Sequence, residues 1–104
     1  MEQIAFTMQL RAGCAEQYRQ RHDAIWPELS ALLHEAGIRD YSIFLDPGSG
    51  KLFAVLRRIP EHTMDDLPGH PVMRRWWTFM ADLMETAPDH QPLTQSLASV
   101  FHLP

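Results

Sequence analysis

The sequence predicts an α+β fold in which the elements follow in the order strand, helix, strand, strand, helix, strand. Apolar residues alternate with period two in several short stretches, which is typical of strands, and recur with helical spacing in two longer ones. Glycine and proline clusters separate these stretches. Because domains most often contain about 100–150 residues, the 104-residue chain is expected to form one domain over residues 1–104.

The first half of the chain contains the first strand and the first helix. Apolar residues at every second position predict a strand over 4–10. After a glycine-containing turn, an apolar stripe predicts a helix from about Cys14 to Ala36. Pro27 interrupts this stripe, and a proline inside a helix removes a hydrogen bond and clashes with the preceding turn. The helix therefore either kinks near Asp23 or restarts with Pro27 at its first position.

The second half predicts a hairpin, a second helix and a last strand. Strands over 41–45 and 52–57 flank a Pro-Gly-Ser-Gly turn. His70-Pro71 opens a helix whose apolar side continues to Met84, and residues 96–103 are expected to form a short final strand. This order is the ferredoxin-like β-α-β-β-α-β motif, whose helices lie on one face of the sheet.

Several predicted strands carry apolar side chains on both faces. In the first strand of the hairpin, Phe44 points to the opposite face from Ile43. In the second strand, Phe53 and Val55 point to the opposite face from Leu52 and Ala54. A second apolar face needs a cover, and a copy of the same sheet is the economical one. The sequence thus predicts a homodimer in which two sheets form an α+β barrel, with an open ligand-binding face as the alternative.

Composition excludes some partners. The formal net charge is −4, with 13 acidic residues against 9 lysines and arginines, whereas a nucleic-acid-binding protein should present a basic face. No apolar run approaches the roughly 20 residues that span a bilayer, so no membrane association is expected. One cysteine, Cys14, and an N-terminus without a basic region favour a cytoplasmic protein.

The histidines do not form a recognisable metal motif. Six are present, but none forms an HExxH or HxH pattern, and there is no CxxC. Since zinc sites need three or four convergent ligands, the sequence predicts none. The glycines at 48 and 50 lie in a hairpin turn with no helix after it, which argues against a phosphate-binding loop.

The most distinctive stretch contains Tyr18, His22 and Trp26. In a helix these residues, spaced by four, lie along one face. A phenol, an imidazole and an indole form an unusual core stripe but a suitable wall for a small polar ligand. An imidazole with an ordinary pKa of about 6.5 suits proton transfer near neutral pH. The alternative is a solvated surface histidine.

Aromatic residues elsewhere offer further contacts for a ligand. Trp76 and Trp77 are adjacent on the second helix, so their side chains point about 100° apart. One of them could stack on the apolar face of a sugar ring, or both could pack in the core. Tyr41 opens a strand and could direct its hydroxyl to the end of a pocket, or pack across strands.

With these residues in place, the chain resembles the L-rhamnose mutarotase family over nearly all of its length. The likeness lies in three blocks: Tyr18-x-x-x-His22-x-x-Ile25-Trp26-Pro27-Glu28-Leu29, Tyr41-Ser42-Ile43-Phe44-Leu45-Asp46 and Arg75-Trp76-Trp77-x-x-Met80-Ala81-Asp82. It also covers Ala5-Phe6-Thr7-Met8-Gln9 and the closing Val100-Phe101-His102-Leu103-Pro104. The first and third of these blocks are specific only in combination. The resemblance implies a dimeric barrel that interconverts the α and β anomers of L-rhamnose without cofactor or metal.

The resemblance also implies roles for individual residues. His22 corresponds to the proton donor of the family, and the residues expected to contact the sugar are Tyr18, Tyr41, Trp76 and Trp77. Trp26 receives no contact and is expected to anchor the helix bend. The base that completes the reaction stays open among water, His22 on the return path, Asp23 and Glu28.

The sequence leaves three other functions open. The sugar could be another 6-deoxy sugar such as L-fucose, since the same apolar side chains could contact its methyl group. A dimeric barrel of this kind could also bind haem or act as a monooxygenase, because fold alone does not fix function. A sugar-binding module without catalysis is a further alternative.

Overall fold

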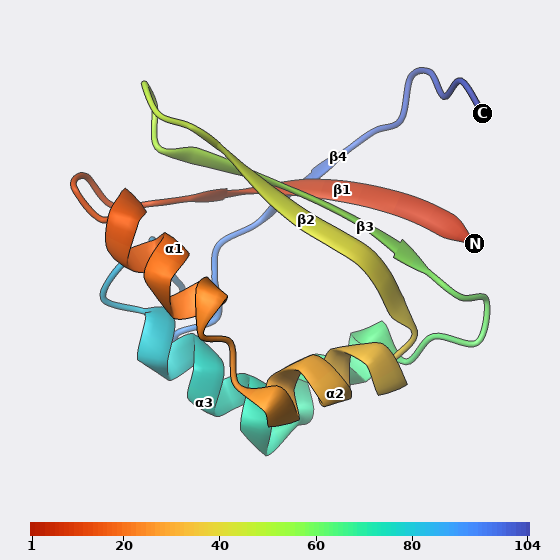
Figure 1. Cartoon of the computed structure of the whole chain (residues 1–104), viewed down its shortest axis with the longest axis horizontal. Helices are drawn as coiled ribbons and strands as arrows, with labels where there is room; N and C mark the ends of the chain where they lie inside the picture. Colours follow the sequence, from red (N-terminus) through yellow and green to blue (C-terminus); the bar gives the residue numbers. More distant parts are fainter.

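The computed structural model describes residues 1–104 and consists of an antiparallel sheet with helices on one face (Figure 1). The strands are β1 (Glu2–Gln9), β2 (Ile38–Asp46), β3 (Lys51–Arg58) and β4 (Gln95–Leu97), in the spatial order β2-β3-β1-β4. The helices are α1 (Ala15–Asp23), α2 (Pro27–Glu35), the 3₁₀ helix η1 (Met64–Gly69) and α3 (Pro71–Met80). The predicted ferredoxin-like order is confirmed, with the first helix divided in two.

The hydrophobic core lies between the sheet and the helices. In β3, Leu52, Ala54 and Leu56 face the helices and are almost fully buried. They pair with inward residues of β1 on one side and β2 on the other. Leu29 of α2 and Met80 of α3 close the core from the helical side. Burial of apolar area at about 25 cal/mol per Å² is the main stabilising contribution of such a layer.

The chain between α1 and α2 restarts the helix at Pro27, as one of the two sequence alternatives predicts. α1 ends at Asp23, Trp26 has extended backbone angles, and Pro27 occupies the first helical position of α2. A proline is well tolerated there because its missing N–H would have no helical partner. The break gives α2 a direction different from that of α1, and α2 packs against α3 (Figure 1).

A bulge in β2 determines which face of the sheet the Tyr41 side chain occupies. Arg39 pairs with Arg57 and Ser42 pairs with Val55, so one extra residue lies between them. Asp40 adopts a positive φ of 49° at this point. A bulge places two residues opposite one and changes which face the following side chains occupy. In a regular strand Ile38 and Tyr41, three residues apart, would point to opposite faces. Because of the bulge, both point to the helical side of the sheet.

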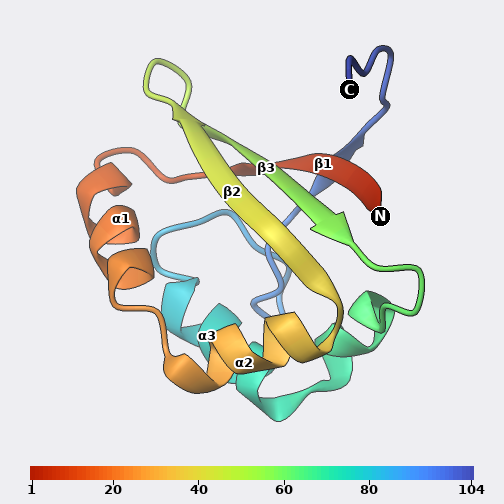
Figure 2. The same cartoon turned by 45° about the vertical axis from the view of Figure 1, so that its right-hand side comes forward.

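Two predicted boundaries are wrong. α3 ends at Met80 rather than continuing to Met84, because Met84 leaves the helix to pair with Leu10 and is buried there. The last strand covers only Gln95–Leu97. Beyond it, residues 98–104 are exposed and have no strand partner in this chain, and they run away from the sheet (Figure 2).

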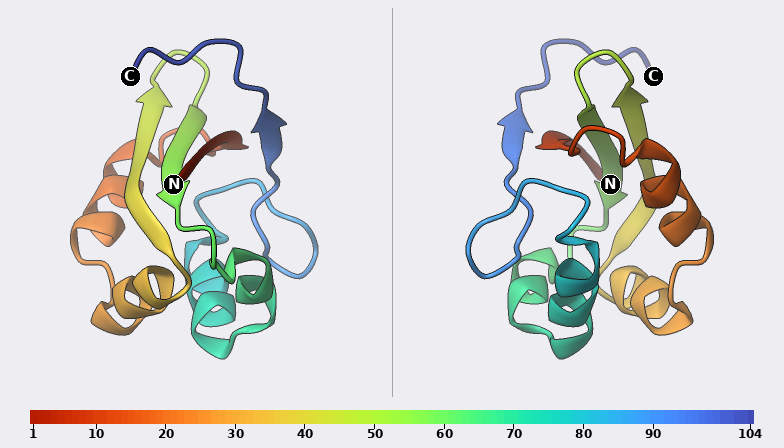
Figure 3. Two further views of the ribbon diagram at one scale, coloured as in Figure 1. Left: turned by 90° about the vertical axis from the view of Figure 1, so that its right-hand side faces the viewer. Right: turned by 90° about the vertical axis from the view of Figure 1, so that its left-hand side faces the viewer.

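The second face of the sheet carries no helix (Figure 3). Phe44 of β2 lies on this face with 64% of its surface exposed, and Leu97 of β4 is opposite Ala5 on the same side. The tail after β4 also carries an exposed aromatic side chain, that of Phe101. The prediction that apolar side chains occupy both faces of the sheet is therefore confirmed. No helix of the structure is both long and apolar enough to cross a membrane.

Candidate active site

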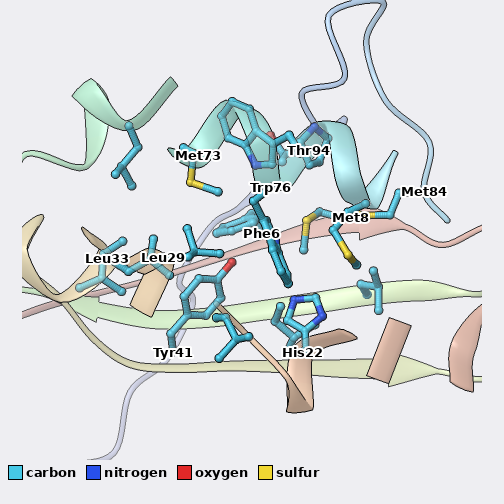
Figure 4. A pocket seen from close by; sticks show the side chains of 18 of the residues that line it. Phe6, Met8, His22, Leu29, Leu33, Tyr41, Met73, Trp76, Met84 and Thr94 are labelled. Carbon is cyan, nitrogen blue, oxygen red and sulfur yellow. The ribbon is translucent and has the colours of Figure 1, made fainter. Parts of the chain in front are cut away.

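A cavity of about 1500 Å³ lies between the sheet and the helices and is lined by residues of both (Figure 4). His22 and Tyr41 enter it from one side and Trp76 from the other. Its volume exceeds the roughly 300–1,000 Å³ of typical ligand pockets, so it has room for a monosaccharide. Most of the lining is apolar, and the residues proposed from sequence supply its aromatic and titratable groups: Tyr18, His22, Tyr41, Trp76 and Trp77.

One hydrogen bond determines the tautomer of His22. Its Nδ1 lies 3.0 Å from the backbone carbonyl oxygen of Tyr18, one turn earlier in α1. A carbonyl oxygen only accepts hydrogen bonds, so Nδ1 must carry a proton and donate it. In the neutral imidazole the other nitrogen, Nε2, then has a free lone pair. Nε2 has no partner among the side chains or backbone groups of the protein.

The environment of His22 favours the neutral ring. Burial lowers the pKa of His22 below its usual value, since desolvation disfavours the charged form. The hydrogen bond to Tyr18 and the nearby charge of Asp23 oppose this shift only in part. At neutral pH the ring is therefore mainly uncharged, with Nε2 ready to accept a proton.

Aromatic rings hold the imidazole on two sides. The ring of Tyr18 lies 4.3 Å from that of His22 at a tilt of 31°. The indole of Trp76 meets His22 edge-on, at 5.4 Å between centroids and 90° between planes. Such edge-to-face pairs add about 0.5–1.5 kcal/mol beyond the area that they bury. The Tyr18, His22 and Trp76 side chains thus form one packed group that spans α1 and α3.

Two tyrosine hydroxyls face the same space. Neither Tyr18 nor Tyr41 has a hydrogen-bonding partner for its hydroxyl within the protein, and neither hydroxyl is sealed from solvent. Burial raises the pKa of Tyr41 to about 12 and raises that of Tyr18 well above its usual value. Tyr41 is still 38% accessible because its exposed part faces the cavity. Both phenols therefore stay protonated and can donate hydrogen bonds to a ligand.

The remaining aromatic residues separate into lining and supporting groups. Trp77 lines the cavity, and the guanidinium of Arg74 lies 5.4 Å from its ring. Trp26 does not line the cavity. It packs edge-on against Trp76, with centroids 5.1 Å apart, and contacts Phe79 at 5.5 Å. Trp26 is thus a support behind Trp76, in keeping with the sequence expectation that it anchors the helix bend.

The two carboxylates left open as the base lie in different places. Asp23 lines the cavity at the end of α1. Glu28 is outside the lining and lies 3.8 Å from Arg75 on the surface. Of the two, only Asp23 is placed near the site. The structure also contains no group of three or more histidine, cysteine, aspartate or glutamate side chains that could hold a metal ion.

Sequence reasoning did not find the polar residues that line the opposite wall. Gln91 and Thr94 enter the lining from the segment that leads into β4, and Ser96 enters it from β4 itself. Figure 4 shows Thr94 on the far side of the cavity from His22. No spacing or motif singles them out, because they lie in a polar connection without periodicity. Their placement depends on β4 pairing with β1.

Comparison with known proteins agrees on one family. The family model for L-rhamnose mutarotase matches residues 3–103. The L-rhamnose mutarotases of Jannaschia sp. and Sinorhizobium fredii are 60% and 61% identical to this chain, and the matches cover 100% and 99% of both partners. These matches give no support to the alternatives of an L-fucose enzyme or a haem-binding protein.

Solved structures agree with the fold. The crystal structure of L-rhamnose mutarotase FA22100 from Formosa agariphila superposes with a TM-score of 0.94 at 38% identity, covering all of both chains. Rv0793 from Mycobacterium tuberculosis superposes with a TM-score of 0.60 at 17% identity, over 98% of this chain and 97% of that one. The second match shows the fold alone.

Proposed function

The chain belongs to the L-rhamnose mutarotase family, and we propose that it interconverts the α and β anomers of L-rhamnose. The observation that supports this most is the free Nε2 of His22, a neutral proton acceptor at a cavity with two unpartnered phenols. The rings of Trp76 and Trp77 add flat apolar surface to the same cavity. These are the groups that acid–base chemistry on a monosaccharide requires.

The reaction needs only two proton movements. The bond between the anomeric carbon and the ring oxygen breaks, the anomeric hydroxyl loses its proton to become an aldehyde, and the ring oxygen gains a proton. After rotation about the adjacent carbon–carbon bond, the hydroxyl attacks the other face of the carbonyl and the proton movements reverse. General acid–base catalysis typically contributes about 10²–10⁴-fold to such a step. Protons are conserved over the cycle.

His22 is suited to both proton movements. The neutral ring first accepts the anomeric proton on Nε2, because Nδ1 is occupied by its bond to the Tyr18 carbonyl. The imidazolium that forms then donates the proton to the ring oxygen. Both sugar oxygens are bonded to the same carbon, so one nitrogen can serve each in turn. Asp23, whose charge favours the imidazolium, would assist the protonated state.

The other site residues would hold the sugar. An indole face matches the apolar C–H face of a pyranose, so Trp76 or Trp77 would provide the stacking surface. Tyr18 and Tyr41 would donate hydrogen bonds to sugar hydroxyls, since their own hydroxyls have no partner in the protein. A 6-deoxy sugar has a methyl group that needs an apolar contact. Leu29, Leu33 and Met73, near Tyr41 in Figure 4, can give it one.

A panel of sugars tests the proposed substrate. Anomer exchange would be measured by saturation-transfer NMR on L-rhamnose, L-fucose, L-mannose and D-glucose, with and without the protein at pH 7. We expect the largest protein-dependent rate for L-rhamnose. L-mannose, which carries a hydroxyl in place of the hydrogen on the methyl carbon, should be slower because that hydroxyl would face apolar side chains without a partner. Exchange of L-rhamnose at the rate of buffer alone would contradict the function.

We also propose that the protein works as a homodimer through the uncovered face of the sheet. Phe44 and Leu97 are exposed on this face, and Phe53 and Val55 lie beside Phe44 in the β2–β3 pairing. A stable dimer usually buries about 1,200–2,000 Å² in total, and a face of this kind paired with its own copy would form a second hydrophobic layer. The exposed apolar tail that contains Phe101 could add to the same contact.

A further inference from the structure

The hydrogen bonds that join α1 to other helices or strands all come from one side chain, that of Arg21. Apart from Arg21, no residue of α1 forms a hydrogen bond with another helix or strand. Only Tyr18 of this helix is buried. Yet α1 carries both Tyr18 and His22, so the position of the proton-transfer group depends on how α1 is held. Arg21 directly precedes His22 in the chain.

The guanidinium of Arg21 makes three hydrogen bonds and one aromatic contact at the end of α3. Its two terminal nitrogens donate to the two carboxylate oxygens of Asp82, at 2.8 and 3.1 Å. One of them also donates to the backbone carbonyl oxygen of Phe79 at 2.6 Å. The guanidinium carbon lies 4.5 Å from the centre of the Phe79 ring. Paired forks of this kind combine charge with a fixed geometry, which a lysine cannot reproduce.

The early end of α3 makes this contact possible. In a continuing helix the Phe79 carbonyl would accept the N–H of Leu83, four residues on. Here the Leu83 N–H bonds to the Met80 carbonyl instead, which leaves the Phe79 carbonyl without a helical partner. Helix ends leave such carbonyls for other donors, and Arg21 occupies this one. The side chain of Arg21 is accordingly well covered, with 14% of its surface exposed.

The same contact reaches the site through aromatic packing. Phe79, under the guanidinium, lies 5.7 Å from Trp76, and Trp76 meets His22 edge-on at 5.4 Å. We propose that Arg21 is a positioning residue: by binding Asp82 and the Phe79 carbonyl, it fixes α1 against α3 and so fixes where His22 lies relative to Trp76. This inference rests on the proposed function, because a sugar in the cavity would have to meet the proton-transfer group and the stacking surface in a fixed relative position.

The contact between Arg21 and Asp82 can be tested by replacing Asp82. Because 63% of its side chain is exposed, the replacement should not unfold the protein. Asp82→Asn removes the charge and one acceptor, whereas Asp82→Glu retains a carboxylate as a conservative variant. Glu2→Gln is the matched control. Glu2 pairs with Arg58 at 2.7 Å, is 59% exposed and lies on β1 away from His22. Arg21→Lys tests the other partner in this contact.

Two measurements are combined: the pKa of His22 from an NMR titration of its ring, and kcat and KM for anomer exchange. In Arg21→Lys and Asp82→Asn we expect kcat to fall about 10- to 100-fold, the scale that a misplacement of about 1 Å can cause, with little change in KM. The pKa of His22 should rise towards its usual value as α1 loosens and water reaches the ring. Asp82→Glu should recover most of kcat, and Glu2→Gln should match the wild type.

An unchanged His22 pKa and kcat in folded Arg21→Lys and Asp82→Asn would overturn the proposal, even if both variants melt at a lower temperature. That result would assign Arg21 to stability alone. The titration also separates this inference from the function. If the wild type exchanged no sugar, the proposed function would fail, while the His22 pKa would still report whether Arg21 sets the packing of α1.

Discussion

The behaviour of the site depends first on the protonation of one residue, His22. Burial lowers its pKa, while the Tyr18 carbonyl and the charge of Asp23 partly offset the shift. Among the groups packed around the ring, Tyr18 and Trp76 are uncharged at neutral pH. The neutral form therefore dominates at pH 7, and in the proposed mechanism this is the form that accepts the anomeric proton.

A pH profile of the protein-dependent exchange tests this assignment. Because the pKa of His22 lies below 6.5, the rate should be level above pH 7 and should fall as the pH drops through that pKa. Protonation then removes the acceptor. The exchange rate of L-rhamnose in buffer, which itself depends on pH, is subtracted at each point. A rate that rose as the pH fell from 7 to 5.5, or a midpoint above 6.5, would be inconsistent with a buried neutral acceptor.

For individual residues, the sequence predicted the site residues that belong to a recognisable pattern but not those in segments without one. Tyr18 and His22 could be proposed because their spacing is helical and their chemistry is unusual on one face. Gln91 and Thr94 could not, because only the pairing of β4 with β1 brings their segment to the cavity. Arg21 also gave no signal, since its role depends on where α3 ends.

At the scale of elements, local chemistry predicted starts better than ends. Pro27 opens α2 because proline fits the first helical position, and His70 caps α3 by accepting the N–H of Val72 at 3.2 Å. Both signals lie in the adjacent sequence. The end of α3 at Met80 does not, because the apolar stripe continues to Met84 and only the pairing with Leu10 takes that residue out of the helix.

The bulge in β2 is a second feature that the local pattern could not supply. Alternation from Tyr41 onwards predicts the correct faces, but it gives no sign that Asp40 is an extra residue with a positive φ. Asp and Asn tolerate this conformation better than most residues. The bulge lets both Ile38, at the start of the strand, and Tyr41 face the helices. Tyr41 thus reaches the cavity through a departure from regular strand geometry.

At the scale of the whole molecule, the uncovered sheet face is expected to pair with a second copy of the chain. Phe44→Glu would place a carboxylate in the proposed dimer contact. We expect the wild type to sediment at twice its 12.0 kDa mass and this variant to sediment as a monomer, because burying an unpaired charge is strongly unfavourable.

Ala31→Glu is the control for the dimer test, since Ala31 lies on the exposed side of α2, away from the sheet and outside the cavity lining. It adds the same charge and should leave the dimer unchanged. A wild type that sediments as a monomer, or a Phe44→Glu variant that remains a dimer at the same concentration, would contradict a contact through this face.

In the proposed mechanism His22 moves the protons of anomer exchange, and the variant His22→Asn tests this role. In His22→Asn the amide nitrogen can occupy the place of Nδ1 and keep the bond to the Tyr18 carbonyl, while no titratable nitrogen remains. Saturation-transfer NMR on L-rhamnose at pH 7 would compare it with the wild type. We expect the protein-dependent exchange to fall by about 10²–10⁴-fold with the fold intact. A folded His22→Asn variant that exchanges L-rhamnose at the wild-type rate would contradict the account.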